Sequence, residues 1–272
     1  MGLPQNPRAV VTGGASGIGR AFCMQLARKK ARLLVADIDI AGAEETADRA
    51  RSEGSDARAV RCDVSKAEEV EDLAARADRD FGGSDLIVNN AGVAAGGLVG
   101  EVPLADWAWV IGIDLWGVIY GCHSFVPRFK RQGSGAIINV ASAAGVASAP
   151  EMSAYNVSKA GVIALSETLA AELAGKDIAV TVLCPTFIQT NIVRDGRMTA
   201  KSRKMGEALM RRAKITPDDA VRQTLTALDE KQLYVFPQAD GKWMWRMKRL
   251  APERYSGILR LMQRRGIFDK MK

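Results

Sequence analysis

Short apolar segments alternate with helical patterns along most of the chain. Six of these segments are bounded by Gly, Ser, Asp or Asn, as strand ends usually are, and they cover residues 9–12, 32–37, 57–62, 86–89, 136–141 and 178–183. Between them apolar residues recur at helical spacing, as in Ala67, Val70, Leu73, Ala74 and Ala77. This alternation predicts an α/β fold, a doubly wound parallel sheet flanked by helices on both faces.

The pattern changes after residue 190. Residues 190–217 are rich in Arg, Lys, Met and Gly, and they predict a mobile loop and helix inserted before a last strand at residues 233–237. A chain of 272 residues suffices for one large α/β domain but is short for two. We therefore expect a single domain over residues 1–240 and a basic helical extension over residues 241–272.

The charge of the chain is uneven. The net charge is +7, yet residues 1–200 contain 20 Lys and Arg against 23 Asp and Glu, whereas residues 201–272 contain 18 against 8. Such asymmetry can indicate an anionic partner, although a solvated basic face is the simpler interpretation. No helix-turn-helix or aromatic-basic strand motif accompanies it, so we expect no nucleic-acid partner.

Cysteine and histidine content limits the possible chemistry. The four cysteines are scattered without a CxxC pair, unlike a disulfide framework. With a single histidine, His123, we expect no metal site, and we interpret His123 as a packing or subunit-surface residue. Residues 1–8 do not resemble a signal peptide, and no apolar run approaches the ~20 residues of a membrane span. We expect a cytoplasmic protein.

A glycine-rich turn, Gly13-Gly14-Ala15-Ser16-Gly17-Ile18-Gly19, joins the first strand to the first helix. Glycines at such a junction let backbone N–H groups approach a pyrophosphate, and the helix N-terminus adds a favourable dipole. Asp37 ends the second strand, where a carboxylate can accept both ribose hydroxyls of an adenosine and repels a 2′-phosphate. Because Ile38 follows, with no basic residue in its place, the sequence predicts NAD rather than NADP. The alternative is that Asp37 only caps the next helix.

Tyr155 and Lys159 lie four residues apart in a strong helical pattern over residues 152–173, so they share one helix face. A tyrosine with a pKa of ~10 is a poor base at neutral pH. A neighbouring ammonium stabilises the phenolate and lowers that pKa. We therefore expect Tyr155 to be a general acid/base, although Tyr-x-x-x-Lys alone is common by chance.

Together these motifs resemble the short-chain dehydrogenase/reductase family. The resemblance covers about residues 7–235 and rests on Thr12-Gly13-x-x-x-Gly17-Ile18-Gly19, Asn89-Asn90-Ala91-Gly92, Ser142 and Tyr155-x-x-x-Lys159. It implies a single Rossmann-type domain for dinucleotide binding and catalysis. It also implies NAD(P)-dependent hydride transfer with a secondary alcohol or ketone, and a homodimer or homotetramer.

The resemblance implies roles for individual residues. Ser142 would hold the substrate oxygen, Tyr155 would be the acid/base, and Lys159 would bind the nicotinamide ribose and tune Tyr155. The cofactor contacts that it implies are Gly13, Ser16, Gly17, Ile18, Gly19, Asp37, Ile38, Asp63, Val64, Asn90, Ala91, Gly92, Tyr155, Lys159, Pro185, Ile188 and Thr190. Of these, Asp63 and Val64 would contact the adenine side, and Ile188 and Thr190 would receive the carboxamide.

Two positions depart from the family pattern. Asp114 stands where the family usually has an asparagine that helps carry a proton-relay water. Asp114 could serve in the same way, with a charge that alters the pH profile, so it joins the catalytic candidates. Thr186 replaces the usual glycine after Pro185, which makes that loop bulkier and less flexible beside the nicotinamide.

The sequence leaves the substrate open. An apolar pocket for a steroid, a terpenoid alcohol or a fatty 3-hydroxyacyl group is suggested by Val93, Leu98, Val99, Val146, Met152, Ile192 and Val193. The alternatives are a dinucleotide-binding regulator without turnover and a sugar-nucleotide epimerase or dehydratase, which also uses Tyr-x-x-x-Lys. The intact Ser142, Tyr155 and Lys159 argue against the regulator, and the lack of an appended substrate domain argues against the epimerase.

The C-terminal extension combines tryptophans, arginines and a helical pattern. Pro252 is expected to open a helix, with an apolar face of Tyr255, Ile258, Leu259 and Met262 opposite Arg260 and Arg264. A basic amphipathic helix of this kind can lie on an anionic membrane surface. We favour packing over the pocket mouth or against a neighbouring subunit, because the apolar stripe is short and Trp243 and Trp245 could anchor it.

Overall fold

The computed structural model describes residues 2–267. Its main sheet has seven parallel strands in the order β3-β2-β1-β4-β6-β7-β9. They are β1 (Arg8–Thr12), β2 (Arg32–Asp37), β3 (Asp56–Arg61), β4 (Leu86–Asn89), β6 (Ser134–Val140), β7 (Asp177–Leu183) and β9 (Tyr234–Val235). The strand order reverses between β1 and β4, which opens a crevice at the carboxyl ends of these strands. The predicted doubly wound parallel sheet is confirmed.

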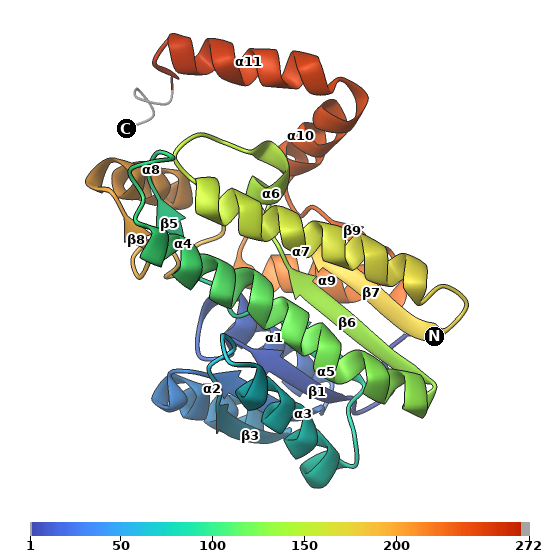
Figure 1. The fold of residues 1–272 in the computed structure, drawn as a ribbon. Helices are drawn as coiled ribbons and strands as arrows, with labels where there is room; N and C mark the ends of the chain where they lie inside the picture. Colours follow the sequence, from blue (N-terminus) through green and yellow to red (C-terminus); the bar gives the residue numbers. More distant parts are fainter. Residues whose placement is uncertain (1, 268–272) are drawn as a thin grey trace.

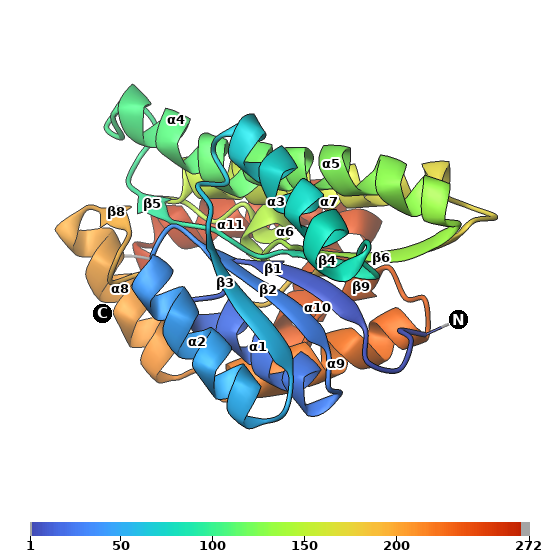
Figure 2. The ribbon, with the colours of Figure 1, turned by 90° about the horizontal axis from the view of Figure 1, so that it is seen from below.

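Helices cover both faces of this sheet (Figure 2). One layer contains α1 (Gly17–Arg28), α2 (Ile40–Ser52) and α9 (Pro217–Asp229), and the other contains α3 (Ala67–Phe81), α5 (Gly117–Gln132) and α7 (Ser153–Glu172). Central strands buried on two faces should be apolar throughout. Accordingly Ile87, Val88, Ile137 and Ile138 are all fully buried.

A long helical segment crosses one face of the sheet and contains α4 (Leu104–Ile111), a π-helical turn η1 (Gly112–Trp116) and α5. Residues 104–132 are long and apolar enough to span a membrane by composition alone, but half of the apolar window is buried inside the fold. We therefore treat it as a core helix. Turns of the π type are rare and often occur at functional sites, and η1 contains Asp114, which is fully buried.

The segments that follow β4 and β7 pair with each other. β5 (Ala95–Gly96) and β8 (Arg197–Met198) form a small parallel sheet, and α8 (Ala200–Arg211) continues from it. The insertion predicted for residues 190–217 thus contains a strand as well as a helix. Glu151, on the loop after the short helix α6 (Ala144–Ala147), binds Lys201 and Ser202 at the start of α8.

The C-terminal extension forms an arm of two helices, α10 (Ala239–Leu250) and α11 (Pro252–Arg264), at one end of the molecule (Figure 1). The predicted helix start at Pro252 is confirmed. Tyr255 is buried and its hydroxyl donates to the Ala147 carbonyl at 2.8 Å. Ile258, expected on the same packed face, is 44% exposed. Leu259 and Met262 are partly buried, so the contact runs from Tyr255 through these two positions and leaves Ile258 outside it.

Candidate active site

The glycine-rich turn is closed by tight backbone contacts. Gly13 and Gly17 have φ angles of 65° and 54°, in the left-handed region that glycine adopts without strain. A Cβ atom at Gly19 would stand 2.0 Å from the Gly13 carbonyl oxygen, so the turn can close only without that atom. The Asn90 amide donates to the carbonyl oxygens of Thr12 (2.8 Å) and Gly13 (3.1 Å) and fixes the turn from the side of β4.

The N-terminus of α1 borders the same turn. Ser16 is the N-cap residue, but its side chain makes no capping hydrogen bond. The first N–H groups of a helix have no intrahelical partners, and together with the helix dipole they favour an anion. Ser16, Gly17 and Ile18 all line a cavity at this point. These residues therefore fit the phosphates of a dinucleotide.

Asp37 lies at the carboxyl end of β2 and borders the same cavity. Its carboxylate accepts hydrogen bonds from the backbone N–H groups of Ala15 (2.9 Å) and Asp39 (3.0 Å). The cap of α2 is Asp39, whose side chain accepts from the Gly42 N–H. Asp39 therefore takes the capping role that the sequence left open for Asp37, and Asp37 is held against the glycine-rich turn.

Ser142, Tyr155 and Lys159 meet where β6 ends and α7 begins. They are 6%, 9% and 2% exposed, and all three border the cavity. The Ser142 hydroxyl accepts from the Ala144 N–H (3.1 Å) and donates to the Pro185 carbonyl (3.3 Å). The Lys159 Nζ atom lies 5.6 Å from the centre of the Tyr155 ring. These three residues form one wall of the cavity. This wall can hold an oxygen atom of a bound molecule and move a proton to or from that atom.

Asp114 forms a buried ion pair with Lys159. Its Oδ2 atom lies 3.3 Å from Lys159 Nζ, and its Oδ1 atom accepts from the Val93 N–H at 2.7 Å. Lys159 also donates to the Val140 carbonyl at 3.1 Å. Asp114 is 0% exposed and does not border the cavity, so it acts on the reacting groups from behind the lining, by its charge and by its pairing with Lys159.

The ion pair changes the proton affinity of the whole wall. Burial raises the pKa of Tyr155; Lys159 opposes this shift, Asp114 adds to it, and the net direction is upward. The lowering of the Tyr155 pKa expected from Lys159 is therefore outweighed in this structure, first by burial and then by the charge of Asp114. Burial lowers the pKa of Lys159, but Asp114 and Tyr155 outweigh it and keep the ammonium protonated.

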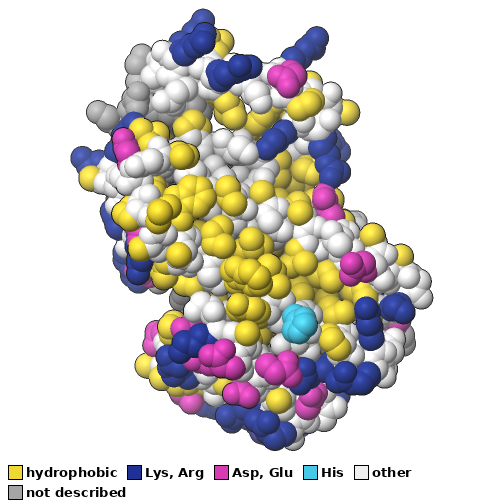
Figure 3. All heavy atoms as spheres, viewed as in Figure 1, with side chains coloured by type: hydrophobic (Ala, Val, Ile, Leu, Met, Phe, Trp, Pro, Cys, Tyr) yellow, Lys and Arg dark blue, Asp and Glu magenta, His cyan; other side chains and the backbone are white. Residues whose placement is uncertain are grey.

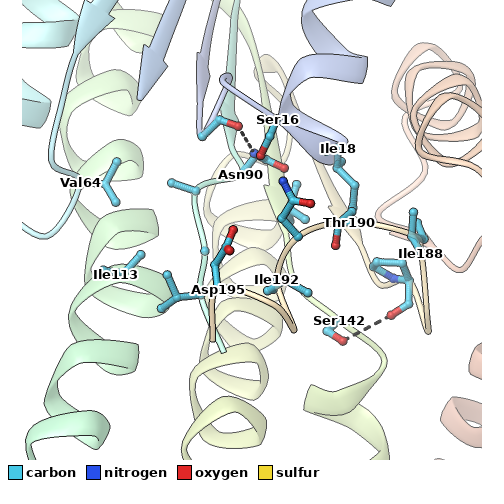
Figure 4. A pocket seen from close by; sticks show the side chains of 18 of the residues that line it. Ser16, Ile18, Val64, Asn90, Ile113, Ser142, Ile188, Thr190, Ile192 and Asp195 are labelled. Atoms are coloured by element: carbon cyan, nitrogen blue, oxygen red, sulfur yellow. Dashed lines mark hydrogen bonds between the residues drawn. The ribbon is translucent and has the colours of Figure 1, made fainter. Parts of the chain in front are cut away.

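The predicted residues surround one cavity of about 320 Å³. Figure 4 shows several of them, with Ser16 and Asn90 on one side and Ser142 and Ile188 on another. Those that line it are Gly13, Ser16, Gly17, Ile18, Asp37, Ile38, Asp63, Val64, Asn90, Ala91, Gly92, Ser142, Tyr155, Lys159, Pro185, Ile188 and Thr190. Gly19 and Asp114 lie behind the lining. No group of three or more His, Cys, Asp or Glu that could hold a metal ion occurs within residues 2–267.

Thr186, expected beside the nicotinamide, also lines the cavity. Other lining residues were not singled out from the sequence. They are Cys62, Ile113, Val140, Ala141, Asn191, Asp195 and Met210. Asp195 lies on the irregular segment after Thr190 (Figure 4), where no periodic pattern gives a signal. Of the apolar residues expected around a substrate, Val93 and Ile192 line the cavity. Val146 instead belongs to the core, and Val99 is 76% exposed.

Thr186, the second departure from the family pattern, binds the start of the arm. Its N–H donates to the Gln238 side chain at 3.1 Å, and its hydroxyl lies 3.4 Å from an Asp240 carboxylate oxygen. Further along α10, Lys248 donates to the Val146 carbonyl (2.7 Å). The arm therefore holds the two segments that flank Ser142.

Comparison with known proteins gives consistent matches. The short chain dehydrogenase family profile matches residues 7–201. The probable oxidoreductase EphD of Mycobacterium tuberculosis is 39% identical over 184 residues, which are 67% of this chain and 31% of that protein. A D-threitol dehydrogenase of Mycolicibacterium smegmatis is 37% identical, covering 68% of this chain and 71% of the relative. The chain thus spans about a third of the length of EphD.

Two further matches cover a larger share of the matched protein. The 3-oxoacyl-[acyl-carrier-protein] reductase FabG of Staphylococcus epidermidis is 36% identical, covering 70% of this chain and 80% of the relative. A crystal structure of a short chain dehydrogenase/reductase from Burkholderia phymatum in complex with NAD superposes with a TM-score of 0.87. It has 32% identity and covers 92% of this chain and 96% of the other. This chain belongs to the short-chain dehydrogenase/reductase family.

Proposed function

We propose that this oxidoreductase transfers a hydride between NAD and an apolar secondary alcohol or ketone. The observation that carries the proposal is that Ser142, Tyr155 and Lys159 border the same cavity as the glycine-rich turn and Asp37. One cavity can therefore hold a dinucleotide against a proton-transfer group. Proximity of this kind is the main requirement for hydride transfer, because the cofactor supplies the chemistry and the protein supplies position.

The proton path follows from the hydroxyl groups on this wall. When bound, a nicotinamide cofactor accepts a hydride from the carbinol carbon or returns one to the carbonyl carbon. The Ser142 hydroxyl, which donates to the Pro185 carbonyl in this structure, would turn its hydrogen to the substrate oxygen. Tyr155 would take the hydroxyl proton during oxidation and give it back during reduction, and the Lys159 ammonium would stabilise the phenolate. Because Tyr155 is 9% exposed, little water competes for this proton.

Asp114 acts in this proposal as a positioning residue. Its carboxylate offsets the charge of Lys159 across 3.3 Å and leaves the Tyr155 phenol harder to ionise. A protonated Tyr155 is the form that donates to a ketone, whereas oxidation needs the phenolate. We therefore expect oxidation to require a more alkaline pH than reduction. The family asparagine helps carry a proton-relay water. Asp114 does not border the cavity, so it would influence such a relay through its ion pair with Lys159.

Cofactor preference is proposed to rest on Asp37. Its carboxylate is fixed beside the glycine-rich turn by two backbone N–H groups, and Ile38 beside it is 59% exposed and carries no charge. A carboxylate at the end of β2 accepts the adenosine ribose hydroxyls and repels a 2′-phosphate. Both features favour NAD over NADP.

The substrate is proposed to be apolar. The side chains of Val93, Ile188, Ile192 and Met210 border the cavity that contains Ser142 and Tyr155. The named relatives range from a threitol dehydrogenase to a reductase of acyl-carrier-protein thioesters, so their names do not choose a substrate. The lining favours a steroid, a terpenoid alcohol or a 3-hydroxyacyl group.

A homodimer or homotetramer is proposed from an apolar band over η1 and α7 (Figure 3). Trp116 and Val157 are 47% and 51% exposed on this face, and Ala160 and Ala164 continue it along α7. Exposed apolar bands of this kind mark protein interfaces. His123 is exposed on α5, which continues directly from the η1 turn that contains Trp116, in keeping with a surface role. A cytoplasmic location is also proposed, since all four cysteines are free thiols.

The test is a panel of steroid, terpenoid and 3-hydroxyacyl alcohols with NAD, followed by NADH absorbance at neutral and alkaline pH. Turnover of any member supports the dehydrogenase. NADH binding without turnover on any alcohol or ketone would support the regulator instead. Interconversion of sugar nucleotides without net NADH release would support an epimerase.

A further inference from the structure

The two helices of the C-terminal arm meet the body in different ways. α10 packs firmly, since Trp245 lies 5.1 Å from the Tyr234 ring and 5.6 Å from the Phe236 ring, and Arg249 pairs with Glu167 at 2.7 Å. In α11 the one buried side chain is that of Tyr255. The packing expected for the whole extension is therefore provided by α10, and it leaves most of α11 exposed.

The exposed surface of α11 is apolar and basic at once. Ile258 and Leu261 are 44% and 47% exposed, although both are large aliphatic residues. Arg254 and Arg265 follow the same stripe at spacings of four, three and four residues, which places all four side chains on one side of the helix. An aliphatic pair between two arginines thus faces solvent.

The surrounding charge is strongly one-sided. Residues 239–267 contain eight Lys and Arg but only two acidic residues, Asp240 and Glu253. Figure 3 shows Lys and Arg side chains gathered at the end of the molecule formed by the arm. A partner for this surface must accept aliphatic side chains and carry negative charge.

We propose that α11 docks on an anionic lipid surface, with Ile258 and Leu261 inserted at the level of the headgroups and Arg254 and Arg265 paired with lipid phosphates. A basic amphipathic helix binds such a surface in the interfacial plane, and its apolar stripe needs to enter only a few ångströms. Arginine is suited to the rim of that stripe, because its aliphatic stem lies on apolar surface while its guanidinium binds phosphate.

A second copy of the chain fits this stripe less well. In a two-fold contact the stripe of one subunit packs against the same stripe of the other, so Arg254 and Arg265 would lie against the arginines of the second copy. Like charges opposed across an interface are unfavourable. A helix of 13 residues is also only ~20 Å long, too short for the ~1,200 Å² of a stable protein interface. A lipid surface needs neither charge reversal nor a large shaped area.

The arm is attached beside the cavity. Lys248 and Tyr255 bind the backbone of Val146 and Ala147, in the segment that follows Ser142. A lipid surface on α11 would therefore lie next to one wall of the cavity. This inference does not depend on the proposed reaction, and its test needs no turnover.

The experiment is co-sedimentation of the full-length protein with vesicles of phosphatidylglycerol and phosphatidylcholine, and with phosphatidylcholine alone. We expect binding to the anionic vesicles and release at 0.5–1 M salt, where screening extends only a few ångströms (~3 Å at 1 M). Replacing Arg254 and Arg265 with Gln should weaken binding about fivefold for each arginine. The paired change Ile258→Asp and Leu261→Asp should abolish it.

A matched control separates docking from general effects of charge. Leu104 is 84% exposed on α4, so Leu104→Asp adds a carboxylate at another exposed aliphatic position and should leave binding unchanged. Melting temperatures of all variants should agree within ~2 °C, because none of these changes removes a buried side chain. Equal binding of the α11 variants and the wild type, or no binding to anionic vesicles, would overturn the proposal. A variant that instead changes the mass measured by light scattering would assign the stripe to a second copy.

Discussion

The cavity wall and the C-terminal arm use similar residues in opposite environments. At the wall, Lys159 pairs with Asp114, and these two side chains are 3% and 0% exposed. In the arm, Arg249 pairs with Glu167 of α7, and these two side chains are 56% and 38% exposed. A buried pair is costly to break, since the partner left behind is an uncompensated charge, whereas an exposed pair contributes little. Changes on the wall should therefore alter chemistry strongly, and loss of the exposed ion pair of the arm should alter stability modestly.

The largest effect is expected for Tyr155→Phe. The change removes only the hydroxyl, so kcat should fall by roughly 10²–10⁴-fold, the usual contribution of a general acid–base group. NADH affinity, measured by fluorescence titration, should stay within a few-fold, because the glycine-rich turn is untouched. A variant that keeps more than about a tenth of the wild-type kcat would remove Tyr155 from the proton path.

The next largest effect is expected at the cofactor. Asp37→Ala with Ile38→Arg removes the carboxylate and adds a cation, so kcat/KM should fall for NAD and rise for NADP. Loss of hydrogen bonds to a charged group costs about 1.5–3 kcal/mol, which corresponds to about ten- to hundredfold. Asp39→Asn is the matched control, because Asp39 caps α2 and does not border the cavity. A wild type that already prefers NADP would contradict the role given to Asp37.

Asp114→Asn tests the buried pair itself. The neutral amide leaves the positive charge of Lys159 unopposed, which favours the phenolate and lowers the pKa of Tyr155. The alkaline-rising limb of kcat/KM for alcohol oxidation should therefore move to lower pH, by about one unit for a charge at this distance. An unchanged limb would show that Asp114 is already neutral at working pH. A shift to higher pH would contradict the electrostatic argument.

The difference between wall and arm also marks what the sequence could predict. The glycine-rich turn was predictable because strand, glycine spacing and helix are local in the chain, and φ angles such as that of Gly13 demand glycine. The ion pair of Asp114 and Lys159 was not, since it joins residues 45 apart through a π-helical turn that leaves no periodic signal. The net direction of the Tyr155 pKa shift was missed because neither the burial of Tyr155 nor the charge of Asp114 is visible in the local pattern.

In the arm, the sequence indicated the helix but not its contacts. Pro252 and the apolar spacing predicted α11, because both are local features. Which side of the helix packs depends on the backbone turn at Ala251, with φ −144° and ψ 66°, and on where Lys248 and Tyr255 meet the body. These contacts join residues that are far apart in the sequence, so a local pattern does not reveal them. Ile258 and Tyr255 looked equivalent in the pattern and are not equivalent in the fold.

The smallest effect is expected within the arm, where two tryptophans provide a matched pair. Trp245 packs against Tyr234 and Phe236, whereas Trp243, two positions before it, is 56% exposed. Truncating a fully buried aromatic residue costs about 3–5 kcal/mol, and a half-buried one on the order of 2 kcal/mol. For a chain of this size Trp245→Ala should lower the melting temperature by about 4–8 °C, and Trp243→Ala by less than ~2 °C. Since α10 also holds Thr186 and Val146, Trp245→Ala should raise KM for the alcohol more than it lowers kcat. Equal melting temperatures for the two variants, measured by circular dichroism, would show that α10 does not pack through Trp245. The arm would then be held mainly by the polar contacts of Arg249, Lys248 and Tyr255, and it would differ even more from the buried wall.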